Sequence, residues 1–124
     1  MSEAETRELQ ELEVSAGALL MVFADIEPQY DEEFNEWYNS QHVPELVRCD
    51  GFLSGRRGVA TDPDQRPRYV AIYELEDESV LEESEQLQPL RGFGPFADKV
   101  NYYRLIFRPT GPFLVPASGK ENQS

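Results

Sequence analysis

Cysteine and histidine are almost absent from this sequence. Its 124 residues include one cysteine, Cys49, and one histidine, His42. A disulfide needs two cysteines, and cysteine or multi-histidine zinc sites need several ligands, so one chain can form neither. We therefore expect no metal site and no cofactor. A single unpaired cysteine also suits a reducing compartment, so we expect a cytoplasmic protein.

Positive charge is also scarce, because 11 Lys and Arg stand against 24 Asp and Glu and give a net charge of −13. A field of this sign repels phosphate backbones and anionic lipids, so we expect neither a nucleic acid nor a membrane as a partner. The longest apolar stretch, from Ala16 to Ala24, is far shorter than the ~20 residues that a membrane-spanning helix needs. The sequence has no P-loop, no dinucleotide-binding glycine motif and no serine-hydrolase elbow.

Apolar residues make up 40% of the chain, enough for the core of one domain. The two ends differ from the middle in composition. Residues 1–14 are acidic, and the chain finishes in the polar string ASGKENQS. We therefore expect an acidic tail at residues 1–14, one folded domain at residues 15–114 and a disordered tail at residues 115–124.

The hydrophobic pattern of this domain predicts the element order β-α-β-β-α-β. Strands are expected at residues 18–26, 52–60, 68–75 and 102–108, and helices from Asp31 and Asp77. Asp31 is a candidate cap for the first helix. Pro44 predicts a break in that helix near His42–Val43, with a short second piece up to Arg48. The order predicts a ferredoxin-like α+β fold, a four-stranded antiparallel sheet with two helices on one face.

The first strand is apolar on both faces, although the two helices cover only one face of the sheet. A domain of this size has no third layer to cover the other face, and an exposed apolar sheet is an interaction surface. We therefore expect a homodimer in which two sheets pack against each other.

The string FNEWYNSQHVPELVRCDGFLSGRR, from Phe34 to Arg57, resembles the EthD-like branch of the dimeric α+β barrel superfamily. That branch has a Trp-Tyr pair on its first helix, then a His-x-Pro-Glu element and a Gly-Phe start to the second strand. The resemblance implies a dimer with a pocket between each sheet and its helices. Members of the superfamily include cofactor-free quinone-forming monooxygenases, polyketide cyclases, muconolactone-type isomerases, dehydratases and haem proteins.

We expect the site to be a cavity between the first helix and the sheet. Phe34, Tyr38 and His42 are spaced by four residues and so share one stripe of the helix. Strand tyrosines of one parity would supply the opposite wall. The candidate substrate-binding residues are Phe34, Trp37, Tyr38, Glu45, Tyr73 and Tyr103.

His42 is the candidate catalytic residue, a general base that Glu45 would orient. The structural alternative is a histidine at a helix end that bonds a freed carbonyl group. Trp37 is open to two readings as well, because packing against the sheet and lining a pocket can coincide in a small barrel.

Three further residues could have either a structural or a functional role. Arg56 and Arg57 point to opposite faces of one strand. The pattern favours a cross-strand pair with Glu74 or another carboxylate over an anchor for a substrate carboxylate or phenolate. Asp25, at the end of the first strand, is more typical of a strand-end cap than of a carboxylate base.

The sequence favours a cofactor-independent enzyme that transfers a proton on an aromatic, polyketide-like or enolisable small molecule. It would be of the cyclase, isomerase or monooxygenase type. The alternatives are a non-catalytic dimer that binds or stabilises a small ligand, and a protein-interaction module that uses the acidic tails. A titrating group in the pocket distinguishes the enzyme from the binder.

Overall fold

The computed structural model describes residues 7–12 and 16–117, which belong to two compact units. The larger unit is Ala16–Arg108, and the smaller one contains the chain ends. Within the described ranges, no helix is long and apolar enough to cross a membrane.

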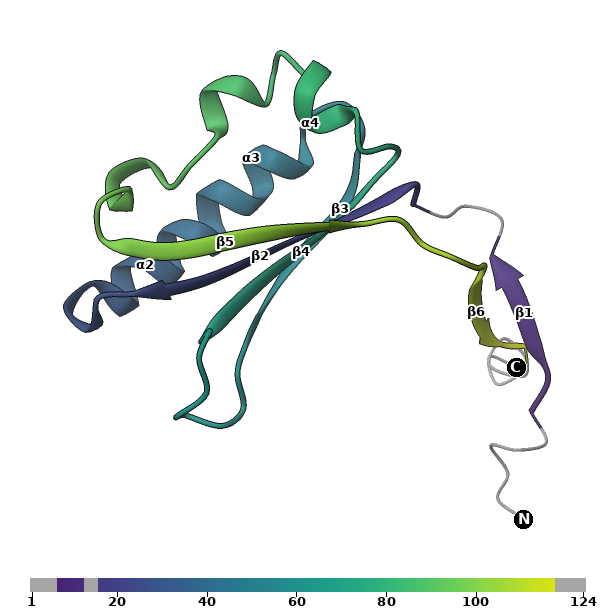
Figure 1. Cartoon of the computed structure of the whole chain (residues 1–124), viewed down its shortest axis with the longest axis horizontal. Coiled ribbons are helices and arrows are strands. Elements are labelled where there is room, and N and C mark those ends of the chain that lie inside the picture. Colours follow the sequence, from purple (N-terminus) through teal and green to yellow (C-terminus); the bar gives the residue numbers. More distant parts are fainter. Residues whose placement is uncertain (1–6, 13–15, 118–124) are drawn as a thin grey trace. The chain divides into compact units, whose positions relative to one another are not determined.

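The larger unit is built on a four-stranded sheet. Its strands are β2 (Ala18–Ile26), β3 (Phe52–Val59), β4 (Tyr69–Leu75) and β5 (Val100–Phe107). They lie in the order β3-β4-β2-β5, and every neighbouring pair is antiparallel. Helices α2 (Asp31–Trp37) and α3 (Val43–Val47) lie over one face of this sheet (Figure 1). The predicted ferredoxin-like α+β fold is confirmed.

The helix predicted from Asp31 does not break near His42–Val43. It continues as a first helical segment in which a π-helical turn precedes Pro44. A π-helix, Tyr38–His42, joins α2 to α3, and the Val43 N–H donates to the Tyr38 carbonyl five residues earlier. Pro44 has no N–H to donate to the carbonyl four residues before it, so the regular α pattern cannot pass through this point. Asp31 does not cap α2, because its carboxylate instead accepts a hydrogen bond from the Tyr69 hydroxyl at 2.5 Å.

The second helical segment is shorter than the sequence pattern predicts. It consists of α4 (Val80–Glu83) and a 3₁₀ turn at Gln88–Leu90. Helix α4 ends at Ser84, whose backbone is extended. Three acidic residues, Glu82, Glu83 and Glu85, occupy the C-terminal half of the predicted helix, where negative charge opposes the helix dipole. Leu81 and Leu87 are nevertheless buried, as the pattern requires.

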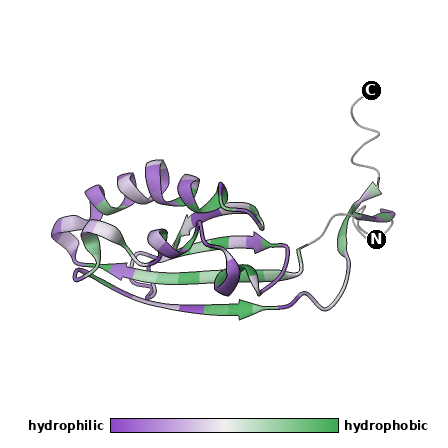
Figure 2. Cartoon of the chain, turned by 90° about the horizontal axis from the view of Figure 1, so that it is seen from above, coloured by the Kyte–Doolittle hydropathy of each residue, from purple (hydrophilic) through white to green (hydrophobic). Residues whose placement is uncertain are grey.

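The helices cover only one of the two faces of the sheet (Figure 1). The helix side carries buried residues such as Leu20, Ala71 and Tyr73. The other side also carries apolar residues, and the strands are green, that is hydrophobic, over long stretches in Figure 2. The residues on this uncovered face are Leu19, Met21, Phe23, Val70, Ile72, Tyr103, Leu105 and Phe107. Tyr103, Leu105 and Phe107 are between 44% and 50% exposed.

Two short strands form a separate small sheet. Strand β1 (Leu9–Leu12) pairs antiparallel with β6 (Phe113–Pro116). The compact larger unit therefore ends at Arg108, whereas the sequence pattern placed one domain at residues 15–114. The expected disorder at residues 115–124 falls largely outside the described residues.

Gly55 allows helix α3 to approach the sheet. A Cβ atom at this position would lie 2.7 Å from Val47 Cγ2 and 2.9 Å from Tyr73 Cδ1. Gly58, on the same strand, has more space, because its nearest neighbour would be Val70 Cγ1 at 3.4 Å. The close contact of α3 with β3 and β4 therefore depends on Gly55.

We expect Gly55→Ala to lower the free energy of unfolding by about 1–3 kcal/mol, because Val47 and Tyr73 must move to accept the methyl group. Gly58→Ala is the matched control and should change it by less than about 1 kcal/mol. Urea denaturation followed by circular dichroism measures both. Equal stability of the two variants would contradict the close packing at Gly55.

Candidate functional site

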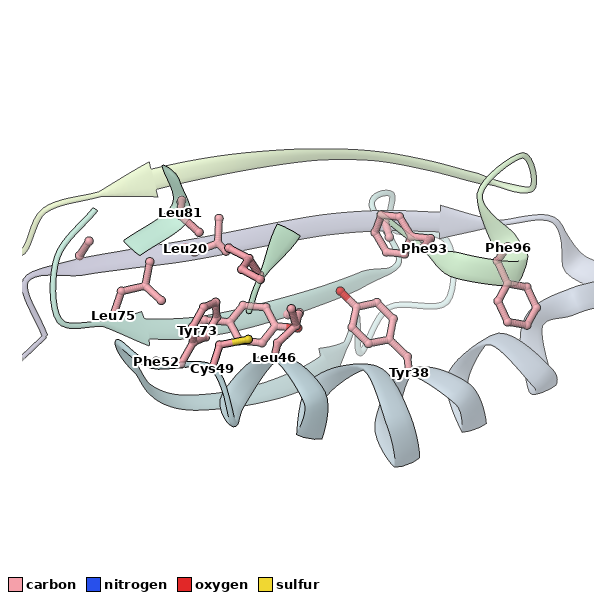
Figure 3. Close-up of a cluster of buried hydrophobic side chains, with 14 of the residues drawn as sticks. Leu20, Tyr38, Leu46, Cys49, Phe52, Tyr73, Leu75, Leu81, Phe93 and Phe96 are labelled. Atoms are coloured by element: carbon pink, nitrogen blue, oxygen red, sulfur yellow. The ribbon is translucent and has the colours of Figure 1, made fainter. Parts of the chain in front are cut away.

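A cavity of about 440 Å³ lies between the helices and the covered face of the sheet. Its residues come from the π-helix, α3, α4, strands β2, β3, β4 and β5 and the segment between α4 and β5. They are Leu20, Val22, Tyr38, His42, Leu46, Phe52, Tyr73, Leu81, Leu87, Leu90, Arg91, Gly92, Phe93, Tyr102 and Arg104. Figure 3 shows Tyr38 reaching from its helix towards the sheet on one side of the buried cluster.

Three of the residues singled out in the sequence meet in this cavity: Tyr38, His42 and Tyr73. Phe34 is completely buried and packs edge-on against Tyr38, so it supports the wall from behind. Trp37 also lies behind the wall. Its ring stacks on the His42 imidazole with centroids 4.6 Å apart and planes inclined by 17°.

Tyr103 does not line the cavity, and the prediction that it does is wrong. It pairs with Phe23 across β2 and stacks on that ring at 5.1 Å, on the uncovered face of the sheet. Its neighbour Tyr102 lies in the cavity wall instead. Because tyrosines occupy both positions, the alternation along β5 does not distinguish the faces, and only pairing with β2 fixes the register.

Glu45 does not orient His42, contrary to expectation. The half-buried Glu45 lies beside Arg48 and Cys49 in a separate, shallow depression. No acidic side chain in the described part of the chain pairs with the imidazole, and no backbone carbonyl there accepts a hydrogen bond from it. Neither the orienting carboxylate nor the alternative helix-end bond is therefore present in the structure.

The electrostatic neighbour of His42 is a cation. Burial of the imidazole, and secondarily the positive charge of Arg57, lower the pKa of His42 to about 4. The side chain is only 6% exposed, so the charged form would lose most of its hydration. His42 is therefore neutral at pH 7, and one ring nitrogen carries a lone pair that can accept a proton.

Arg57 packs into an aromatic cage. Its guanidinium carbon lies 4.1 Å from the centre of the Tyr38 ring and 5.2 Å from that of Tyr69. Nη1 donates to the Asn39 Oδ1 at 3.3 Å, whereas the buried Nη2 has no hydrogen-bond partner in the described part of the structure. Burial lowers the pKa of Arg57 from its usual value, although the nearby tyrosines oppose this shift.

The expected cross-strand pair with Glu74 is absent, because Glu74 accepts a hydrogen bond from Ser54 at 2.8 Å. A bulge between Phe52 and Ser54 shifts the pairing of β3 by one residue. Phe52 and Arg57 therefore face the helices although their sequence parities differ, and Arg56 faces the other side. Strand alternation alone could not reveal this arrangement.

Two of the tyrosines in the cavity wall, Tyr38 and Tyr73, are protonated donors. Burial raises the pKa of both Tyr38 and Tyr73 above the usual tyrosine value. The Tyr73 hydroxyl is buried and has no hydrogen-bond partner within the described residues. The Tyr38 hydroxyl influences it electrostatically, but the two groups do not meet in hydrogen-bond geometry. The wall of the cavity that contains His42 thus also holds a hydroxyl without a hydrogen-bond acceptor among the described residues.

Asp25 has a structural role in the loop before β4. Its Oδ1 accepts a hydrogen bond from the Arg68 backbone N–H at 2.8 Å and lies 3.8 Å from the Arg66 Nε. Asp25 is not among the cavity residues, so the strand-end cap is the reading that the structure favours. In the described residues, no group of three or more His, Cys, Asp or Glu side chains is arranged to hold a metal ion.

Solved structures with the same fold include proteins described as oxygenases. SnoaB, a cofactor-independent oxygenase from Streptomyces nogalater, is 20% identical, with 77% of this chain and 96% of that chain covered and a TM-score of 0.58. The ActVA-Orf6 monooxygenase of Streptomyces coelicolor, solved with nanaomycin D, is 18% identical over 82% of this chain and 94% of that chain, with a TM-score of 0.57.

HapK from Hahella chejuensis has a TM-score of 0.61 at 11% identity, covering 76% of this chain and 93% of that chain. No protein-family model and no curated protein matches the sequence. At these identities the solved structures establish the fold that this chain shares with them.

The buried, neutral state of His42 should make stability depend on pH. In the unfolded chain His42 binds a proton below about pH 6.5, whereas in the folded protein it does so only below about pH 4. The unfolded state therefore holds the extra proton between these values, and stability falls as the pH drops through this window.

Between pH 7 and pH 5, the native protein should lose about 2 kcal/mol more unfolding free energy than His42→Phe, which keeps a ring against Trp37 but cannot titrate. Urea denaturation at both pH values gives the two differences, and the variant supplies the contribution of all other groups. Parallel losses in the two proteins would show that His42 is not held neutral by burial.

Proposed function

We propose that the chain is a cofactor-independent enzyme that transfers a proton on an aromatic or enolisable small molecule. The observation that carries this proposal is the neutral imidazole of His42 in the wall of a largely apolar cavity. Its nitrogens make no hydrogen bond to other described residues, so they remain available to a substrate. The Tyr73 hydroxyl, which has no hydrogen-bond partner among the described residues, provides a donor in the same cavity.

In this proposal His42 removes a proton from a substrate C–H or O–H, and the bond's electron pair remains on the substrate. The conjugate anion is the common starting point for isomerisation, cyclisation and reaction with dioxygen. The oxygenases among the proteins of the same fold favour the last of these. Dioxygen would accept the electron pair and form a C–O bond, and the imidazolium of His42 would return its proton to the resulting peroxide anion. Loss of water from this hydroperoxide would leave a carbonyl group.

The strength of His42 as a base is limited in the empty cavity. An imidazole with a pKa of about 4 is fully in its basic form at pH 7 but accepts a proton less readily than one with a pKa near 7. Negative charge that develops on a substrate would offset the effect of Arg57 and raise this pKa. Proton transfer would thus become more favourable as the transition state is approached.

The finer assignments also belong to this proposal. In the resemblance of Phe34–Arg57 to the EthD-like branch, His42 is the histidine of the His-x-Pro-Glu element. We retain membership of that branch as a hypothesis. A cytoplasmic location likewise remains a prediction.

A homodimer is the second part of the proposal. The uncovered face of the sheet presents Tyr103, Leu105 and Phe107, all about half exposed, beside Phe23 and Met21. Exposed apolar patches of this kind are typical of protein interfaces. A second copy would bury this face without covering the cavity, which lies on the opposite side of the sheet.

Anthrone, an aromatic ketone with an enolisable CH₂ group, tests the chemistry. Under dinitrogen in D₂O the protein should accelerate deuterium exchange at the CH₂, and under dioxygen it should form anthraquinone and water. His42→Ala should slow the exchange by about 10²–10⁴-fold, because the general base is lost. NMR measures the exchange, and circular dichroism verifies that the variant folds.

His42→Gln serves as a second variant, since it fills more of the vacated space and cannot act as a base. Unchanged exchange in either folded variant would refute the role of His42. Anthrone that binds to the native protein without any exchange would favour the non-catalytic binder. A cavity that excludes small molecules would favour the protein-interaction module.

Substitution at neighbouring positions of β5 tests the dimer. Leu105→Lys places a charge on the uncovered face and should convert a dimer to a monomer at micromolar concentration. Ile106→Lys places the same charge on the opposite face, where Ile106 is 40% exposed, and should leave the dimer intact. Sedimentation velocity measures both, and a native protein that sediments as a monomer would overturn the proposal.

A further inference from the structure

The charge of the cavity is opposite to that of the chain. The chain has a net charge of −13, yet the cavity wall contains two arginines, Arg91 and Arg104, and no aspartate or glutamate. Acidic residues outnumber basic ones by more than two to one in the sequence. A wall without any carboxylate is therefore a local feature that the overall composition does not explain.

Arg104 is the cation that is free to meet a ligand. It lies on β5 opposite Val22, on the cavity side of the sheet, and is exposed. Its side chain forms no ion pair and no hydrogen bond with the other described residues. Arg108, further along the chain, differs in this respect, because its guanidinium bonds to the Glu78 carboxylate at 2.7–2.8 Å.

Arg91 is held in place beside the same cavity. Its Nη2 donates to the Leu81 carbonyl of α4, which fixes the guanidinium next to the segment before β5. Arginines presented in this way bind carboxylates well, because a planar guanidinium can donate two parallel hydrogen bonds. The rest of the wall is mainly apolar and aromatic, as the Leu20, Phe52 and Phe93 side chains illustrate.

We propose that the cavity binds an aromatic carboxylate, with the ring against the apolar wall and the carboxylate paired with Arg104 and Arg91. This deepens the proposed function, on which it rests for the use of the cavity as a substrate site. A carboxylate is favoured over a phenol because it is charged at pH 7, whereas a phenol is mostly neutral there. The ligand's charge would also lie in the cavity that contains His42.

Two ligands of nearly equal shape test this proposal: 2-naphthoate, which is an anion, and 2-naphthamide, which is neutral. Isothermal titration calorimetry should show 2-naphthoate binding about 10-fold more tightly to the native protein. Arg104→Gln should remove this preference by weakening only the anion. Arg104→Lys should retain part of it.

Arg48→Gln is the matched control, since Arg48 is exposed and lies outside the cavity wall. It removes the same charge from the protein and should leave both affinities unchanged. Because His42 is the only histidine of the chain, its ring resonances locate the ligand. 2-Naphthoate should shift these resonances in the native protein, as observed by ¹H–¹⁵N NMR.

The outcomes separate this inference from the proposed function. Equal affinities for the two ligands, absence of binding, or a ligand that leaves the His42 resonances unmoved would overturn the carboxylate site. In each case, loss of deuterium exchange in His42→Ala would still support the proposed enzyme. A clear preference for 2-naphthoate together with full exchange activity in His42→Ala would instead support the binding site and refute the base.

Discussion

The cavity wall depends on the cation–π contacts of Arg57, whose guanidinium packs against aromatic rings of the first helical segment and of the sheet. The guanidinium carbon lies within 5.7 Å of the ring centres of Phe34, Tyr38 and Tyr69, and a single hydrogen bond ties the group to Asn39. Cation–π contacts of this kind strengthen when they are shielded from water. They hold the ring of Tyr38 between the cation and the cavity.

The same contact sets the chemistry of the neighbouring histidine. A buried imidazole is already reluctant to take up a proton, and a cation nearby increases that reluctance. The protein therefore gains a base that is neutral at pH 7 without the help of a carboxylate partner. The stacked Trp37 ring restricts the orientation of the imidazole, a task that a hydrogen-bonded carboxylate performs in many other sites.

Much of the fold follows from patterns that are local in the sequence. The apolar run of β2, the turn-rich loop before β4 and the helical spacing of Phe34 and Tyr38 each indicate one element, and the structure contains all of them. The second helical segment was less predictable, because its apolar spacing favours a helix whereas its acidic residues oppose one. The pairing of the chain ends brings residues 9–12 and 113–116 together, and such distant partners leave no local pattern.

The site was predicted less completely than the fold, because the positions of some of its residues depend on how the strands pair with one another. Tyr38, His42 and Tyr73 lie on elements whose faces are clear from the sequence, and they meet in the cavity. The position of Tyr103 depends on how β5 pairs with β2, and that of Arg57 on the bulge in β3. Both are settled by contacts between strands, which alternation within one strand does not encode.

The π-helix at Tyr38–His42 has a consequence for the alignment of the cavity residues. Residues four apart in an α-helix are offset by about 40°, so a long series drifts around the helix axis. A π-turn holds more residues than an α-turn, and four residues within it drift in the opposite sense. The offset gained from Phe34 to Tyr38 is thus largely cancelled by His42. Phe34, Tyr38 and His42 therefore lie within one stripe that faces the sheet, whereas in a continuous α-helix the same three residues would spread over about 80°.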